Sequence, residues 1–139
     1  MSEQGNIQIV QEAYSAFSRG DIPGLLATLT EDVTWTMPGE PEIPFAGKRS
    51  GKAGAAEFFR RLNESDEVLN FEPREFFANG DKVVVLGLYR ARARATGKIV
   101  ENDWAHVFGL RSGKISSWIE YCDTASVASA YRQESAAAR

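Results

Sequence analysis

The segment Glu101–Asp123, ENDWAHVFGLRSGKISSWIEYCD, holds the only histidine and the only cysteine of the 139-residue chain and two of its three tryptophans. Apolar and polar residues alternate on either side of Ser112-Gly113-Lys114. Such alternation around a glycine turn is typical of a β-hairpin. The segment therefore predicts two antiparallel strands that carry the rarest side chains of the chain.

The register of this hairpin decides which side chains share a face. If Gly113 takes the left-handed position of a three-residue loop, Leu110 pairs with Lys114 and His106 lies opposite Trp118. One face then carries Trp104, His106, Phe108, Leu110, Ser116, Trp118, Glu120 and Cys122. A slip by one residue would turn all of them to the other face, so the predicted site depends on this register.

The strand before the hairpin supports this orientation. Arg90, Arg92 and Arg94 would share one face, and three unpaired guanidinium groups cannot line an apolar cavity without a large cost. We expect them to face outward, toward Glu101 and Asp103. The alanines between them then face inward, where the space they leave fits either a ligand or the close approach of a helix.

Apolar residues recur at helical spacing at the start of the chain and predict a helix that ends near Gly20. Its apolar stripe consists of Ile7, Val10, Tyr14 and Phe17. Asp21 is expected to cap a second short helix that runs through Leu29. The alternating residues of 33–37 then predict a strand, which Pro38 ends.

Residues 38–52 contain three of the five prolines and predict an ordered loop, followed by a third helix. The buried stripe of that helix is Ala55, Phe58, Phe59 and Leu62. From Val68 onward the period becomes two, and three glycine turns divide the pattern into four consecutive antiparallel strands. Pro73 indicates a bulge or an edge in the first of them, and a last short helix is expected from Thr124. Helices followed by a meander predict one α+β domain over residues 1–139, with a core at about 7–130 and helices on one face of a curved sheet.

Composition excludes several classes of function. A formal net charge of -3 offers no general attraction to nucleic acid. There is no apolar run of roughly 20 residues and no signal-peptide pattern at the start, so we expect no membrane association and a cytoplasmic location. A single cysteine and a single histidine provide neither an internal disulfide nor zinc-ligand spacing, and no metal or cofactor is expected.

Three stretches resemble the nuclear transport factor 2-like superfamily. AYSAFSRGDIPGLLATLTEDVTW (13–35) is similar to its opening helix, Gly-Asp corner and first strand, and FAGKRSGKAGAAEFF (45–59) to its third helix. WAHVFGLRSGKISSWIEYCDT (104–124) is similar to the closing hairpin of the SnoaL-like branch, which includes polyketide cyclases and ketosteroid isomerase-related proteins. The resemblance implies a cone-shaped, cystatin-like α+β barrel, with a curved mixed or antiparallel sheet wrapped around a helical layer.

The SnoaL-like cyclases carry a histidine and an acid on their last two strands, and these positions fall on His106 and Glu120. The resemblance thus implies that Glu120 is the general acid/base, with a glutamate where the branch usually has aspartate, and that His106 orients it or shares its proton. The alternatives without chemistry are that His106 is a hydrogen-bonded core histidine and, if the register slips, that Glu120 is a surface acid. Met37 stands where the ketosteroid isomerases have their carboxylate base. Steroid double-bond migration by the isomerase mechanism therefore lacks its base in this chain.

An apolar pocket is expected around these two residues. Its predicted substrate-binding lining is Tyr14, Phe17, Trp35, Met37, Phe45, Phe59, Tyr89, Trp104, Phe108, Trp118 and Cys122. The same residues could simply fill the core.

Two functions remain open. The first is a cofactor-independent enzyme that isomerises, cyclises or dehydrates a hydrophobic carbonyl compound, and the second is a non-catalytic binding protein for a small hydrophobic ligand. The resemblance also implies a homodimer through the outer sheet face, where Val107, Ile119 and Tyr121 offer apolar area.

Overall fold

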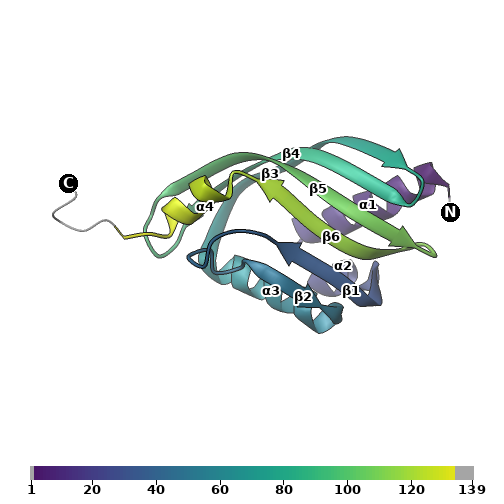
Figure 1. The fold of residues 1–139 in the computed structure, drawn as a ribbon, viewed down its shortest axis with the longest axis horizontal. Coiled ribbons are helices and arrows are strands. Elements are labelled where there is room, and N and C mark those ends of the chain that lie inside the picture. The colour runs from purple at the N-terminus through teal and green to yellow at the C-terminus, as the bar shows by residue number, and fades with distance from the viewer. Residues whose placement is uncertain (1, 134–139) are drawn as a thin grey trace.

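The computed structural model describes residues 2–133 and consists of four helices and six strands (Figure 1). In chain order they are α1 (Glu3–Ser18), α2 (Ile22–Ala27), β1 (Leu29–Met37), β2 (Gly47–Ser50), α3 (Gly51–Ser65), β3 (Asp66–Asn79), β4 (Lys82–Ala93), β5 (Ile99–Arg111), β6 (Lys114–Cys122) and α4 (Thr124–Ala130).

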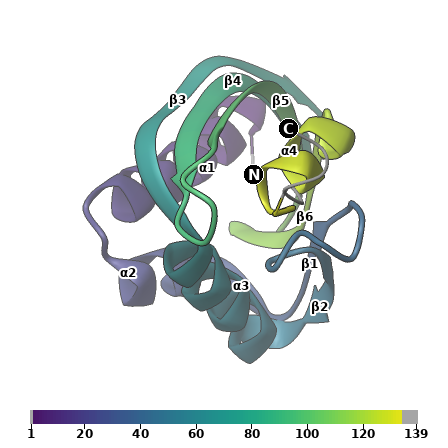
Figure 2. The ribbon, with the colours of Figure 1, turned by 90° about the vertical axis from the view of Figure 1, so that its left-hand side faces the viewer.

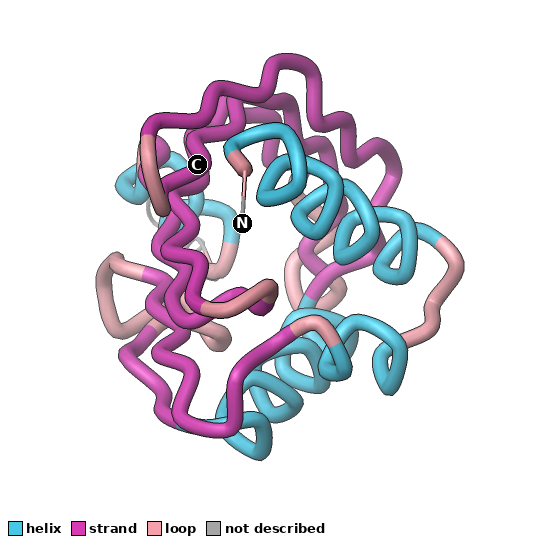
Figure 3. The backbone as a smooth tube through the Cα atoms, turned by 90° about the vertical axis from the view of Figure 1, so that its right-hand side faces the viewer, coloured by secondary structure: helices cyan, strands magenta, loops and turns pink. Residues whose placement is uncertain are grey.

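The strands form one sheet in the order β2-β1-β6-β5-β4-β3. β1 runs parallel to β6 and all other neighbours are antiparallel, so the sheet is mixed. Figure 2 shows the sheet curling from β3 round to β2, and Figure 3 shows from the opposite end that α1 and α3 cross its concave side. This is the predicted α+β class, a curved mixed sheet wrapped around a helical layer.

Several local predictions are confirmed. The four-stranded meander is β3 to β6, and β3 lies at the sheet edge with an irregular register between Pro73 and Glu75. Both predicted caps are present: Asp21 Oδ1 accepts a hydrogen bond from Gly24 N at 2.9 Å, and Asp123 Oδ1 accepts one from Ser126 N at 3.1 Å. No helix within residues 2–133 has the length and apolarity that crossing a bilayer requires.

Two predictions about the first half are wrong. The predicted loop 38–52 contains strand β2, which is short, polar and exposed at three of its four residues, so it carries no apolar alternation that could reveal it. The second helix ends at Ala27, and Leu29 begins β1 instead. There Ile115 N donates to Thr28 O, so pairing with β6 draws the chain into the sheet.

The predicted hairpin register is also wrong. The turn is a two-residue Ser112-Gly113 loop with φ angles of 51° and 80°, as a type I′ turn requires, and Arg111 pairs with Lys114. His106 pairs with Glu120 instead of Trp118, because the register shifts at a bulge just beyond the turn.

The shift from position 118 to 120 equals two residues, so strand parity is preserved. The predicted face therefore still looks inward, with one change: Ile115 takes the buried position beside Leu110, and Ser116 is the extra residue of the bulge.

The arginines of β4 face outward as predicted, with one change of partner. Arg90 Nε lies 3.2 Å from Glu101 Oε2, whereas Arg92 pairs with Glu67 on β3 and not with Asp103. The partner differs because β4 lies between β3 and β5, so its outward arginines can reach acids on either neighbouring strand. The alanines between the arginines, Ala91 and Ala93, are fully buried.

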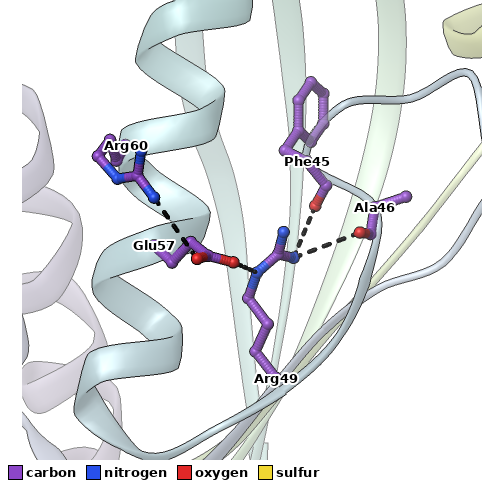
Figure 4. A network of polar contacts seen from close by, with 5 residues as sticks. All are labelled: Phe45, Ala46, Arg49, Glu57 and Arg60. Atoms are coloured by element: carbon purple, nitrogen blue, oxygen red, sulfur yellow. Dashed lines mark hydrogen bonds and ion pairs between the residues drawn. The ribbon is translucent and has the colours of Figure 1, made fainter.

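The loop between β1 and β2 is tied to α3 by Arg49 (Figure 4). Its Nη1 donates to Phe45 O at 3.0 Å and to Ala46 O at 3.4 Å, and its Nε lies 3.6 Å from Glu57 Oε1. Because the guanidinium holds both sides, the Phe45 ring stays packed edge-on against Phe58 of α3, with 6.0 Å between ring centroids.

Candidate functional site

A hollow lies between the concave face of the sheet and the helices. Its volume is about 80 Å³, which corresponds to about two or three waters at the roughly 30 Å³ that each takes up in the liquid. Of the predicted site residues, it is lined by His106, Glu120, Tyr14, Phe17, Trp35, Met37, Phe45, Phe59, Tyr89, Trp104, Phe108, Trp118 and Cys122. The structure thus brings every predicted site residue to one hollow.

Further lining residues were not named in the prediction: Ala13, Leu25, Phe58, Leu62, Phe71, Asn102 and Val127. Asn102 has the same parity on β5 as Trp104 and His106, so extending the alternation by one step would have found it. Leu25 and Val127 come from helices α2 and α4, and nothing in their local sequence indicates that these helices reach the hollow.

Three polar side chains form a chain of hydrogen bonds on its wall. His106 Nδ1 lies 2.7 Å from the Tyr14 hydroxyl, and His106 Nε2 lies 2.9 Å from Glu120 Oε1. Tyr14 comes from α1, and the other two face each other across β5 and β6. His106 is 4% exposed, whereas the Glu120 side chain retains 19% of its exposure. The carboxyl group is therefore more exposed to solvent than the imidazole.

The charge states follow from burial. Burial, and then the charge of Glu120, raises the pKa of Tyr14 well above its usual value, so the phenol keeps its proton. Burial lowers the pKa of His106, against the opposing effect of Glu120, so the imidazole is neutral near pH 7. Within residues 2–133 the phenol proton has no acceptor other than Nδ1. Tyr14 therefore donates to Nδ1, and the Nε2–H of His106 donates to Glu120.

Aromatic rings enclose this chain. Trp104 stacks on His106 with 3.8 Å between ring centroids, and Trp35 stacks on Trp118 at 4.5 Å. The Trp104 indole lies over Gly87 on β4, where a Cβ atom would come within 2.3 Å of Cζ2 of the indole. A glycine is needed at this position so that the indole can lie flat beside the histidine.

Three donors at the wall have no hydrogen-bond partner within the described residues: Trp35 Nε1, Trp104 Nε1 and Asn102 Nδ2. A buried donor without a partner costs about 1–3 kcal/mol. Each of these nitrogen atoms is closed to water, so a ligand with acceptor oxygens could satisfy the N–H groups only after the wall side chains shift.

Cys122 lies on the same wall. Burial and then the charge of Glu120 raise the pKa of its thiol, so the thiol stays protonated and is a poor nucleophile. Within residues 2–133 no three His, Cys, Asp or Glu side chains gather in a way that could ligate a metal ion.

A second acid lies near the hollow but is engaged elsewhere. Tyr89 Oη donates to Asp66 Oδ2 at 2.5 Å, and the Tyr131 hydroxyl donates to Asp66 Oδ1. Tyr89 was predicted only as a lining residue, and its hydroxyl is used by this acid. Asp66 is 2% exposed, and burial raises its pKa although both tyrosines oppose the shift.

The curled mixed sheet, the helical layer across its concave side and the enclosed aromatic hollow define a nuclear transport factor 2-like α+β barrel. Within this class, a model of the SnoaL-like domain matches residues 10–118, and the chain belongs to the SnoaL-like family.

Solved structures agree with this assignment. A nuclear transport factor 2-like protein of Burkholderia xenovorans is 39% identical, with a TM-score of 0.87 over 95% of this chain and 99% of that one. TerC, crystallised with polyporic acid, is 27% identical, with a TM-score of 0.82 over 93% of this chain and 99% of its own. An uncharacterized protein of Mycobacterium tuberculosis is 26% identical over 93% of this chain and 98% of its length.

Proposed function

We propose that this protein is a cofactor-independent enzyme that moves a proton on an apolar carbonyl compound, with Glu120 as the general base. The observation that carries the proposal is the Tyr14–His106–Glu120 chain, because it ends in a partly exposed carboxyl group at an apolar hollow. In this reading Tyr14 and His106 are positioning residues: the phenol fixes the histidine tautomer, and the imidazole N–H fixes one carboxylate oxygen.

The proposed chemistry starts at the carbon next to the substrate carbonyl. Glu120 takes the proton, and the electron pair moves onto the carbonyl oxygen to give an enolate. The unpartnered N–H groups of Asn102 and Trp104 are our candidates for binding that oxygen. Return of the proton to another carbon is an isomerisation, attack of the enolate carbon on a second carbonyl is a cyclisation, and loss of a β-hydroxyl as water is a dehydration.

The remaining lining is proposed to bind the hydrocarbon part of the substrate. Almost all of it is aromatic or aliphatic, and burial of apolar surface contributes about 25 cal/mol per Å². The TerC complex with polyporic acid is a precedent for a bound organic molecule in a related protein.

The test is exchange of carbon-bound protons with deuterium. Apolar ketones are incubated with the protein in D₂O, and loss of the α-proton signal is followed by NMR. We expect exchange with the wild-type protein and a loss of about 100- to 10,000-fold in Glu120→Gln. Glu101→Gln is the matched control, because Glu101 lies on the outer face of the same hairpin and pairs with Arg90. Equal exchange in Glu120→Gln and wild type would contradict the role of Glu120.

A binding protein is the second candidate, and the three unpartnered donors favour it equally, since binding alone would satisfy them. Ketone binding by the wild-type protein without exchange above that of the ketone alone would support this candidate over the enzyme.

We also propose a homodimer through the outer sheet face. Cross-strand pairing aligns Phe77, Val84, Val107 and Ile119 in one row across four strands, and Tyr121 is 55% exposed in the neighbouring row. Light scattering should give about twice 15.3 kDa, and Val107→Arg should give 15.3 kDa. A wild-type mass of 15.3 kDa would overturn the dimer.

A further inference from the structure

A second concavity lies on the helix side of the edge strand β3. It has a volume of about 750 Å³ and is bordered by the end of α1, by α3 and by β3. Its outer part is lined by Ile22, Ala56, Val68 and Leu69, none of which reaches the inner hollow. We call this concavity the β3 groove.

The β3 groove and the inner hollow are separated by a wall that is one side chain thick. Phe17, Phe59, Leu62 and Phe71 line both spaces. Ring contacts connect the phenyl groups, with Phe17 5.1 Å from Phe71 and 5.8 Å from Phe59 between centroids. These side chains carry no polar atom, so a rotation of one ring breaks only dispersion contacts. Phe17 also lies one residue before the end of α1, where the helix constrains it least.

The β3 side of the groove carries exposed apolar side chains. Val68 and Leu69 are 39% and 38% exposed, and the pairing of β3 with β4 is irregular between Val68 and Asn70. Edge strands commonly protect themselves with charged residues, proline or bulges, and β3 does so over most of its length. At Val68 and Leu69, however, it presents apolar side chains beside an apolar wall. The charged and amide groups of Arg60, Asn63 and Asn70 also border the groove.

The small volume of the inner hollow limits the size of the ligand that it can hold alone. Its 80 Å³ corresponds to about two or three waters, enough for a short chain and no more. A larger ligand must extend beyond the hollow, and the four shared side chains are the barrier between the hollow and a ready apolar surface. On the basis of the proposed function, we propose that the β3 groove is a second subsite, which binds the apolar tail or second ring of a ligand whose carbonyl group lies at Glu120.

The test is the dependence of affinity on ligand length. Binding of 2-alkanones from 2-pentanone to 2-undecanone is measured by calorimetry. With the groove in use, affinity should continue to rise by about fourfold per methylene after the inner hollow is full. A plateau at the shorter ketones in the wild-type protein, or no binding by any of them, would overturn the proposal.

Ala56→Arg places a charged side chain in the groove without touching the inner hollow, and Ala53→Arg, one turn earlier on an exposed position of α3, is the matched control. We expect Ala56→Arg to bind the short ketones as the wild type does and to lose the increment of the long ones, about tenfold or more for 2-undecanone. Ala53→Arg should behave as wild type. Equal affinity of Ala56→Arg and Ala53→Arg for 2-undecanone would overturn the subsite.

Phe17→Ala provides an independent measurement, because it removes part of the wall. It should speed both association and dissociation of 2-undecanone, measured by stopped-flow competition. Unchanged rates for 2-undecanone would overturn the proposed passage. If Ala56→Arg instead changes the mass in light scattering and leaves ketone affinity unaltered, the groove is an interface between copies of the chain and the ligand assignment is wrong.

The subsite and the proposed function can fail separately. Glu120→Gln should lose α-proton exchange and keep the length dependence of binding. If binding depends on ketone length but the wild-type protein does not exchange α-protons, the subsite is retained and the proposed enzyme is wrong. If the wild-type protein exchanges α-protons but binding does not depend on ketone length, the enzyme is retained and the subsite is wrong.

Discussion

Asp66 and Glu120 are both acids that meet tyrosine or histidine at the inner face of the sheet, but Asp66 is buried and Glu120 is partly exposed. Both oxygens of Asp66 accept hydrogen bonds, from Tyr89 and from Tyr131, and the side chain is almost completely enclosed. Glu120 accepts a hydrogen bond from His106, also contacts the Cys122 thiol, and keeps part of its surface open at the hollow.

This difference separates an acid that holds the fold from one that is available for chemistry. Asp66 joins the start of β3 to the end of α4, since Tyr131 is the C-cap of that helix. Because Asp66 is 2% exposed and both of its oxygens are engaged by tyrosines, a ligand has no access to it. Glu120 is fixed through one oxygen by a neutral imidazole, which positions the carboxyl group without neutralising it.

Asp66→Leu should cause the largest loss of stability. The leucine leaves the hydroxyls of Tyr89 and Tyr131 without an acceptor, and each orphaned group costs about 1–3 kcal/mol. Urea denaturation should therefore show a loss of about 2–6 kcal/mol. Glu120→Gln is the contrasting variant, because its amide oxygen still accepts from His106, and it should stay within about 1 kcal/mol of the wild type. Equal losses in the two variants would refute the contrast.

Gly87→Ala should affect both stability and the site. The new methyl group meets the Trp104 indole at 2.3 Å and the Glu72 carbonyl oxygen at 2.6 Å, so something must move. Overpacking of this kind costs about 1–3 kcal/mol. Because Trp104 stacks on His106, exchange activity should fall as well. Gly80→Ala is a control away from the site, with open space around its Cβ but a φ of +61°, so it should destabilise without changing activity per folded molecule.

Tyr14→Phe removes one hydroxyl and leaves the ring packing intact. The loss of the bond to His106 Nδ1 should cost about 0.5–1.5 kcal/mol of stability. The histidine tautomer is then no longer fixed, so kcat for α-proton exchange should fall while ketone affinity changes little. A proportional fall in affinity with unchanged kcat would assign Tyr14 to ligand binding instead.

The two clusters should respond to acid in opposite directions. The pKa of Asp66 is raised in the folded state, so its contribution to stability is complete below the unfolded value of about 3.9 and is lost as pH rises through the folded pKa. The pKa of His106 is lowered, so its contribution is present above about 6.5 and is lost as pH falls through the folded pKa.

The measurement is urea denaturation at pH 7 and at about pH 4.5. The stability gap between wild type and Asp66→Leu should widen at the lower pH, and the gap between wild type and His106→Gln should narrow. Surface carboxyls such as Asp32 are present in all variants, so their titration cancels in these differences. Gaps that move in the same direction would contradict the assigned shifts.

Much of the inner wall could be predicted from the sequence because strand parity depends only on local alternation. The wrong register of the hairpin did not disturb it: a type I′ turn and a bulge shifted the pairing by an even step, so His106, Trp118 and Glu120 kept their face. The same shift placed Glu120 directly opposite His106, whereas the predicted register put them on a diagonal. The hydrogen bond between them therefore depends on a bulge that alternation does not reveal.

The sequence by itself determined the α+β class, the inward face of the meander and the capped helix starts, because each follows from residues within a few positions of one another. Only the tertiary structure decided that β1 runs parallel to β6, that Tyr14 reaches His106 across 92 positions, and that Asp66 closes on Tyr131. Periodicity fixes the side of the strand or helix to which a residue points. Its hydrogen-bond partner depends on how the whole sheet curls and packs on the helices, and no short stretch of sequence contains that information.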